Sequence, residues 1–95
     1  HQMVLNLGTL TATHGISEKM KDDMEFRQFV LDSVSRYCKG DWGELSNADK
    51  QANVAAIANG YEILGAYVSE ELRAKIWIIT EADRSYTTIL FPSEY

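Results

Sequence analysis

The sequence predicts a single α+β domain over residues 1–95: a small antiparallel meander of three strands plus an N-terminal strand, with two helices packed on one face. Three observations support this. The length of 95 residues suits one domain with a small core. Two stretches with helical periodicity precede three short apolar runs. Short connections between those runs favour antiparallel neighbours, and helices set apart from a meander are typical of α+β domains.

The N-terminal strand is predicted at residues 3–13, where "MVLNLGTLTAT" alternates loosely and is rich in Val, Leu and Thr. His1 and Gln2 stand before Met3, as an expression remnant would, and are left out of the fold. Residues 13–15 break the strand pattern. Ser17 then predicts a short turn of helix, because a serine hydroxyl can cap the free amides of such a turn.

The first helix is predicted at about 23–38. Asp22-Asp23-Met24-Glu25 resembles a capping box, in which an acid caps the free amides and Glu25 reaches back. Apolar side chains follow at helical spacing, namely Phe26, Phe29, Val30, Val34 and Tyr37. Gly40 ends this helix, since glycine turns readily into the left-handed region.

The second helix is predicted at about 47–58. Ser46 is its expected cap, with Asp49 where a capping box usually has Glu. The dipeptide Asn59-Gly60 is a strong stop signal. The small apolar side chains of this helix would let it approach its neighbour closely.

Strands are predicted at 61–68, 74–80 and 85–91, and Pro92 ends the last. Ile76 and Ile78 would point to one face of the sheet, and Trp77 and Ile79 to the other. Because two helices on one face leave the second face bare, we expect it to be covered by loops and the first strand, by a protein partner, or by a second copy in a homodimer.

Composition restricts the function classes. The net charge is −5, from 14 acids against 9 scattered bases, which argues against nucleic-acid binding. Cys38 is the only cysteine, so an internal disulfide and a four-thiolate zinc site are excluded, and a reducing cytoplasm is the expected location. No apolar run approaches the roughly 18 residues of a membrane span. No catalytic residue, metal site or cofactor is predicted.

The stretch "GDWGELSNAD" at residues 40–49 is interpreted as the joint between the two helices, with Trp42 filling the gap. Asp41 could instead be a polar anchor beside a shallow pocket. Asp49 and Asn53 are four residues apart and share a helix face. Either Asn53 is a buried amide that ties the helix to a loop backbone, or the two residues form a ligand-facing pair.

The segment "TEADRSYTT" at residues 80–88 places two acids and a base at a hairpin tip. We expect Arg84 to pin the turn through a salt bridge with Glu81 or Asp83. The alternative is a recognition loop, because hairpin tips often carry binding residues on rigid scaffolds.

The motif G-D-W-G at residues 40–43 and the ending W-I-I-T-E-A-D-R-S…T-T-I-L-x-P-x-E-Y resemble a family of small uncharacterised proteins from bacterial plasmids, phages and conjugative elements. The resemblance covers residues 40–95, and Asp49 and Asn53 match its D and N four apart. Residues 13–16 depart from the T-P-G-A of the family, and residues 17–37 diverge. The resemblance implies an accessory product of mobile DNA, without an established activity.

The leading functional hypothesis is a non-catalytic intracellular interaction protein that binds a protein partner or itself. The first alternative is a small-ligand or enzymatic site formed by Asp41, Asn53, Glu81, Asp83 and Arg84. The second is an acidic inhibitor that imitates DNA, as an anti-restriction or anti-CRISPR factor would. The residues expected to bind a ligand or partner are Asp41, Trp42, Asp49, Asn53, Trp77, Glu81, Asp83 and Arg84.

Overall fold

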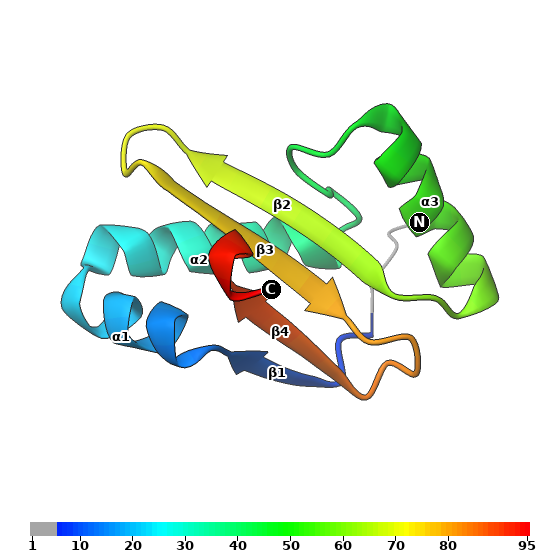
Figure 1. The fold of residues 1–95 in the computed structure, drawn as a ribbon, viewed down its shortest axis with the longest axis horizontal. Coiled ribbons are helices and arrows are strands. Elements are labelled where there is room, and N and C mark those ends of the chain that lie inside the picture. The colour runs from blue at the N-terminus through cyan, green and yellow to red at the C-terminus, as the bar shows by residue number, and fades with distance from the viewer. Residues whose placement is uncertain (1–5) are drawn as a thin grey trace.

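The computed structural model describes residues 6–95 and has an α+β fold with three α-helices and a four-stranded mixed sheet (Figure 1). The strand order across the sheet is β1-β4-β3-β2. The elements in chain order are β1 (Thr9–Ala12), α1 (His14–Asp22), α2 (Met24–Cys38), α3 (Asn47–Asn59), β2 (Ile63–Ser69), β3 (Ala74–Thr80), β4 (Tyr86–Leu90) and the 3-10 turn η1 (Pro92–Glu94).

The meander predicted for the last three strands is confirmed. β2 pairs antiparallel with β3, and β3 pairs antiparallel with β4. The N-terminal strand is shorter than the predicted residues 3–13: its described part is Thr9–Ala12, and residues 1–5 lie outside the described part of the chain. β1 runs parallel to β4, with Thr11 opposite Thr88, so the sheet is mixed rather than purely antiparallel.

An acid caps α2 and Ser46 caps α3, as predicted, but the described residues show no return bond from the Glu25 side chain. The side chain of Asp23 accepts a hydrogen bond from the amide of Phe26 at 3.0 Å, and α2 begins at the next residue. The Ser46 hydroxyl accepts from the amide of Asp49 at 3.1 Å and starts α3. Gly60 ends α3 in the left-handed region, with φ of 75°.

The prediction of two helices was wrong, because a third helix, α1, occupies His14–Asp22. Thr13, and not Ser17, caps it by accepting from the amide of Ile16 at 3.3 Å. Ile16 is fully buried, and Met20 one turn later packs against the core. A single apolar pair at i and i+4 is enough here, because α1 packs beside α2.

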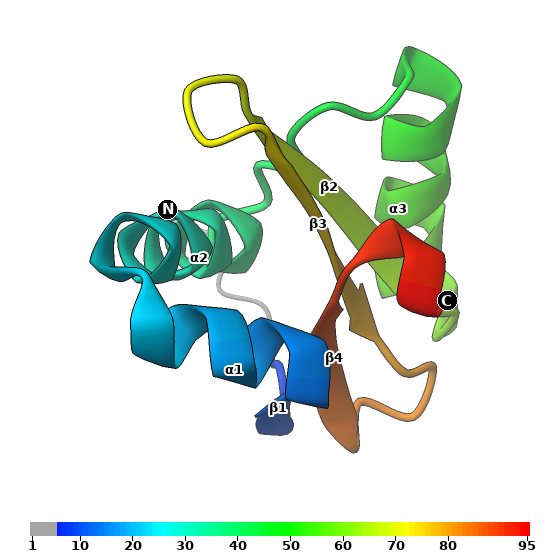
Figure 2. The same cartoon turned by 60° about the vertical axis from the view of Figure 1, so that its left-hand side comes forward.

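The prediction that the helices share one face of the sheet was also wrong. Figure 2 shows α1 and α2 on one side of the sheet, and α3 on the other side together with η1. On the α2 side, Ile76 and Ile78 are completely buried. On the opposite side, Ile79 is buried and Trp77 is half-buried. The face that we expected a partner to cover is therefore occupied by the chain's own α3 and C-terminal turn.

A chain of buried hydroxyl groups crosses the core between α2 and the sheet. The Tyr37 hydroxyl lies 2.7 Å from Oγ1 of Thr80, which lies 2.8 Å from Oγ1 of Thr87. Thr87 in turn donates to the carbonyl of Leu7 at 2.7 Å, and Tyr37 donates to the carbonyl of Ile63 at 3.2 Å. Burial raises the pKa of Tyr37 to about 12, so this side chain is neutral in the core at physiological pH.

Candidate functional site

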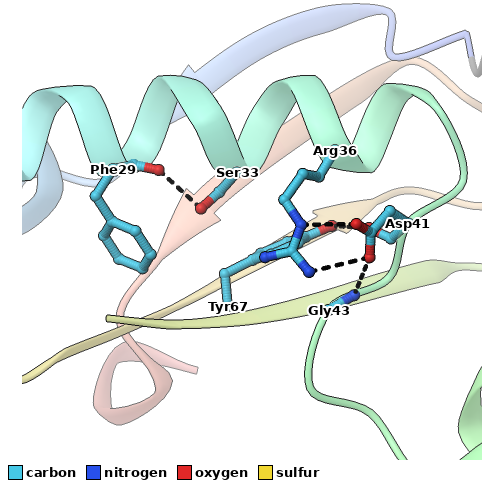
Figure 3. Close-up of polar contacts among 6 residues, drawn as sticks. All are labelled: Phe29, Ser33, Arg36, Asp41, Gly43 and Tyr67. Carbon is cyan, nitrogen blue, oxygen red and sulfur yellow. Dashed lines mark hydrogen bonds and ion pairs between the residues drawn. The ribbon is translucent and has the colours of Figure 1, made fainter. Parts of the chain in front are cut away.

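Asp41 holds the loop between α2 and α3. Its carboxylate accepts hydrogen bonds from Nε of Arg36 at 2.7 Å and from Nη2 of Arg36 at 3.1 Å, and also from the amide of Gly43 at 3.1 Å (Figure 3). The Arg36 guanidinium holds the pKa of Asp41 below its usual value. Both side chains are about half exposed, so solvent screening limits the pair to about 0.2–1 kcal/mol of stability.

Trp42 is buried in the core, but it does not fill a gap between the two predicted helices, because α2 and α3 lie on opposite sides of the sheet. Its side chain is 5% exposed, and its ring meets the ring of Tyr37 edge-on at 5.6 Å between centroids. The backbone carbonyl of Trp42 accepts from the amide of Ala66 at 3.1 Å, and the amide of Glu44 donates to the carbonyl of Ala66. The loop thus lies along the free edge of β2.

Asn53 and Asp49 have different environments although they are four residues apart on α3. Asn53 is buried, and its side-chain amide donates to the carbonyl of Leu64 at 2.6 Å and accepts from the amide of Leu64 at 3.2 Å. Asp49 is exposed in the first turn of α3. Asn53 therefore ties the helix to backbone as expected, although that backbone is a strand edge and not a loop.

Arg84 contacts backbone carbonyls, and the predicted salt bridge with Glu81 or Asp83 was wrong: none of the ion pairs among residues 6–95 includes Arg84. Its guanidinium binds four carbonyl oxygens at the end of α3 and in the hairpin turn, those of Ala56 at 3.0 Å, Tyr61 at 2.7 Å, Glu81 at 3.1 Å and Ala82 at 3.1 Å. These bonds fasten α3 to the β3–β4 hairpin.

Of the two acids of the hairpin tip, Asp83 is exposed and Glu81 is half-buried. Asp83 accepts from the amide of Ser85 at 2.9 Å, and hydrogen bonding with Ser85, through its side chain first and then its backbone, lowers the pKa of Asp83. Glu81 and Asp83 line a shallow depression together with Ala82, Ser85 and Tyr86. Trp77 is separate from them, with its ring against that of Tyr95 at 5.6 Å between centroids.

The eight predicted site residues therefore lie at different places in the fold and do not form one common site. Asp41 serves the α2–α3 loop, Asn53 the β2 edge, and Arg84 the junction of α3 with the hairpin. The depression that contains Glu81 and Asp83 is not lined by Asp41, Asn53 or Arg84. The three residues with the most hydrogen bonds hold the architecture together.

A different groove lies between the first half of α2 and the β2–β3 turn. Its volume is about 330 Å³. Its apolar part is formed by Phe29 and Leu72, which are both half-buried and pack against the core cluster. The remaining lining residues are polar or acidic, namely Glu25, Gln28, Asp32, Ser69 and Glu71.

The groove is negatively charged around an apolar floor. Three carboxylates line it, from Glu25, Asp32 and Glu71, and no Lys or Arg side chain does. The amide of Gln28 donates to the carboxylate of Asp32 at 2.8 Å. Phe29 forms the floor, its ring 6.2 Å from that of Phe26, and its carbonyl accepts from the Ser33 hydroxyl at 2.8 Å (Figure 3).

This groove is not among the sites predicted from the sequence. The α2 side of the groove is visible in the sequence, because Glu25, Phe29 and Asp32 are spaced at i, i+4 and i+7 and so lie along one line of a helix. Glu71 and Leu72 come from a turn much later in the chain, and only the fold places them opposite that line.

In the described part of the chain, no helix is long and apolar enough to cross a membrane, and no group of three His, Cys, Asp or Glu residues is arranged to hold a metal ion. No protein-family model, curated protein or solved structure matches the sequence or the fold of the chain. What the structure defines is an α+β protein with a mixed sheet and an acidic groove at one end.

Proposed function

We propose that this chain is a non-catalytic interaction protein that docks a basic segment of a partner protein in the groove between α2 and the β2–β3 turn. The observation that supports this is the combination of Phe29 and Leu72 at the floor with three carboxylates at the rim. Such a site favours a segment in which an apolar side chain enters the groove while neighbouring Lys or Arg side chains meet the acids.

The size of the groove fits this occupant. A volume of about 330 Å³ lies at the lower end of the range for ligand pockets and accommodates one or two apolar side chains. Lysine and arginine can lay their aliphatic stems along the apolar floor while their charged heads reach the rim. The occupant is therefore an extended or helical peptide segment that presents one apolar residue among bases.

Charge contributes mainly to the rate and specificity of docking. Exposed ion pairs each contribute at most about 1 kcal/mol, and salt weakens them. The net charge of −5 attracts basic partners over a longer range and raises the association rate. A single small groove with exposed ion pairs is expected to give affinities on the order of micromolar, and these affinities should fall as salt increases.

The direct test is an NMR titration of the isotope-labelled protein with a short peptide of alternating lysine and leucine. We expect the amide signals of Gln28, Phe29 and Leu72 to shift in a saturable way at low salt. The paired charge reversal Glu25→Lys with Asp32→Lys should weaken binding at least tenfold.

The matched control reverses two exposed acids outside the groove, Glu62→Lys with Glu44→Lys, and leaves the net charge equal to that of the groove variant. This control should retain most of the binding. Equal weakening in both variants, or shifts spread over the whole acidic surface, would show that only net charge matters and would overturn the proposal.

We also propose that the protein acts inside a bacterial cell as an accessory factor of a mobile genetic element. The motif resemblance over residues 40–95 supports this, and the single cysteine, Cys38, suits a reducing compartment. Deleting the gene from its element and measuring the frequency of transfer and maintenance tests this role. Unchanged transfer and maintenance in several hosts would contradict it.

A further inference from the structure

The two edges of the sheet differ in how their backbone groups are satisfied. At the β2 edge, Asn53 binds the amide and carbonyl of Leu64, and the loop at Trp42 and Glu44 binds those of Ala66. These contacts take the place of a neighbouring strand. An edge closed in this way cannot pair with another chain along that part of its length.

The β1 edge is open. The amides of Thr9 and Thr13 donate to carbonyls of the β4 side, so the alternate residues Leu10 and Ala12 direct their amides and carbonyls away from the sheet. No described helix or strand lies beyond β1 at this edge (Figure 1). The side chain of Leu10 is 47% exposed beside these backbone groups.

This edge is also free of charged residues. Residues 6–13 contain no Asp, Glu, Lys or Arg, and neither does β4 beside them, although 24% of all residues are charged. A two-fold contact places each surface against its own copy, so any net charge there would face like charge. A neutral edge on a chain with net charge −5 therefore suits a second copy of itself better than a charged partner.

We propose that β1 pairs antiparallel with β1 of a second copy, across a two-fold axis beside Thr11, and so joins the two sheets into one. In this register Leu10 of each copy exchanges a pair of hydrogen bonds with Ala12 of the other. Thr11 faces Thr11 of the second copy as a non-hydrogen-bonded pair. Gly8, with φ of 62° and its amide bound to the Asn6 side chain, ends the extended segment and limits the register.

The contact between the two β1 strands is short and therefore weak. β1 has four residues, so the interface is smaller than the roughly 1,200 Å² of a standard stable complex. Burial of Leu10 against Ala12 of the second copy adds apolar contact to the backbone hydrogen bonds. The dimer is therefore reversible, with dissociation on the order of micromolar concentrations. The dimer contact does not include the acidic groove, so the proposed dimer can be confirmed or refuted independently of the proposed function.

Disulfide trapping tests the register directly. In a Cys38→Ser background, Thr11→Cys would place two thiols across the axis on residues whose Cα atoms are about 4.5 Å apart, within the range that a disulfide spans. We expect mild oxidation to convert this variant into a covalent dimer. Thr9→Cys is the matched control, because Thr9 lies in the same strand on the same face but is opposite Thr13 of the second copy. It should stay largely monomeric.

Sedimentation equilibrium of the unmodified protein gives the second readout. Leu10→Pro removes the outward amide, which an edge strand tolerates, together with the half-exposed leucine side chain, and should weaken dimerisation at least tenfold while circular dichroism and the urea midpoint confirm folding. Val68→Lys, at an exposed position on β2, should leave it unchanged. A monomer at all concentrations, stronger trapping through Thr9→Cys than through Thr11→Cys, or dependence on Val68 instead of Leu10 would overturn the proposal.

Discussion

The side chain of Asn53 on α3 pairs with the backbone of Leu64 on β2 as a neighbouring strand would, with its Nδ2 2.6 Å from the carbonyl oxygen and its Oδ1 3.2 Å from the amide nitrogen. This side chain thus fixes the helix to the sheet and closes the β2 edge at Leu64, while the loop at Trp42 and Glu44 closes it at Ala66. Ala56, three residues later on α3, is buried beside Asn53, and its small side chain lets the helix come close to the sheet.

Asn53→Ala is expected to lower the free energy of unfolding by about 2 kcal/mol, because it leaves two partly buried backbone groups of Leu64 without partners. Urea unfolding measures this loss, and hydrogen exchange at the Leu64 amide should accelerate. Asn59→Ala is the control in the same helix, since the Asn59 side chain makes only an exposed bond to the carbonyl of Ala55. A similar cost for both variants would contradict the edge-closing role.

Arg84→Gly should destabilise the protein, whereas Arg73→Gly should be neutral or stabilise it by up to about 1 kcal/mol. Both arginines have positive φ, 62° and 51°, a region that costs a non-glycine residue roughly 1–2 kcal/mol. Glycine relieves this cost at either position. Only at residue 84 does it also remove the guanidinium that binds four carbonyl groups. Thermal unfolding of the two variants side by side separates these effects, and a stabilising Arg84→Gly would refute the fastening role.

Gly43→Ala should cost several kcal/mol more than Gly60→Ala, although both glycines have φ of 75°. A Cβ at residue 43 would collide with the carbonyl oxygen of Ala66, whereas a Cβ at residue 60 would meet no atom within 4 Å. The strain of alanine at positive φ is the same at both positions. The difference in unfolding free energy between the two variants therefore measures how closely the loop approaches β2. Equal urea midpoints would mean that the loop can move away from β2 at little cost.

Tyr37→Phe should destabilise the protein by about 1 kcal/mol at pH 7, by removing the hydroxyl that bonds Thr80 and Ile63. The difference in unfolding free energy between Tyr37→Phe and the unmodified protein should shrink at high pH. Burial raises the folded-state pKa of Tyr37 to about 12, above the ordinary 10, so the folded state holds this proton more tightly. The stability that depends on protonated Tyr37 is complete below pH 10 and is lost as pH rises through about 12. Urea unfolding at pH 7, 9 and 11 tests this; a constant difference would contradict it.

The sequence predicts the elements whose signals are local. Asp23 and Ser46 identify helix starts because a cap bonds an amide only three residues away. The three strands of the meander carry runs of apolar residues with turn residues between them, and their antiparallel order follows from short connections. The helix α1 is missed because its apolar side is reduced to Ile16 and Met20, a weak periodic signal.

The rest depends on relationships between distant segments. Nothing within β1 specifies that it pairs parallel with β4, and the alanine-rich face of α3 does not say which side of the sheet it will cover. The contacts of the candidate site residues likewise depend on distant segments. Arg84 stands among acids in the sequence, so charge pattern suggests an ion pair, while its actual partners are carbonyl groups that every residue possesses. The groove at Phe29 and Leu72 likewise exists only after folding.

The pairing of β1 with β4 bears on how the chain is made. Thr11 and Thr87, which bond across this pair, are 76 positions apart, so β1 leaves the ribosome long before its neighbour is synthesised. The helices α1 and α2 can pack early, because their contacts are close in sequence, whereas closing a loop of this length is entropically slow. Every newly made chain therefore carries β1 as an unpaired strand on both of its edges until β4 emerges, and translation speed sets how long that state lasts.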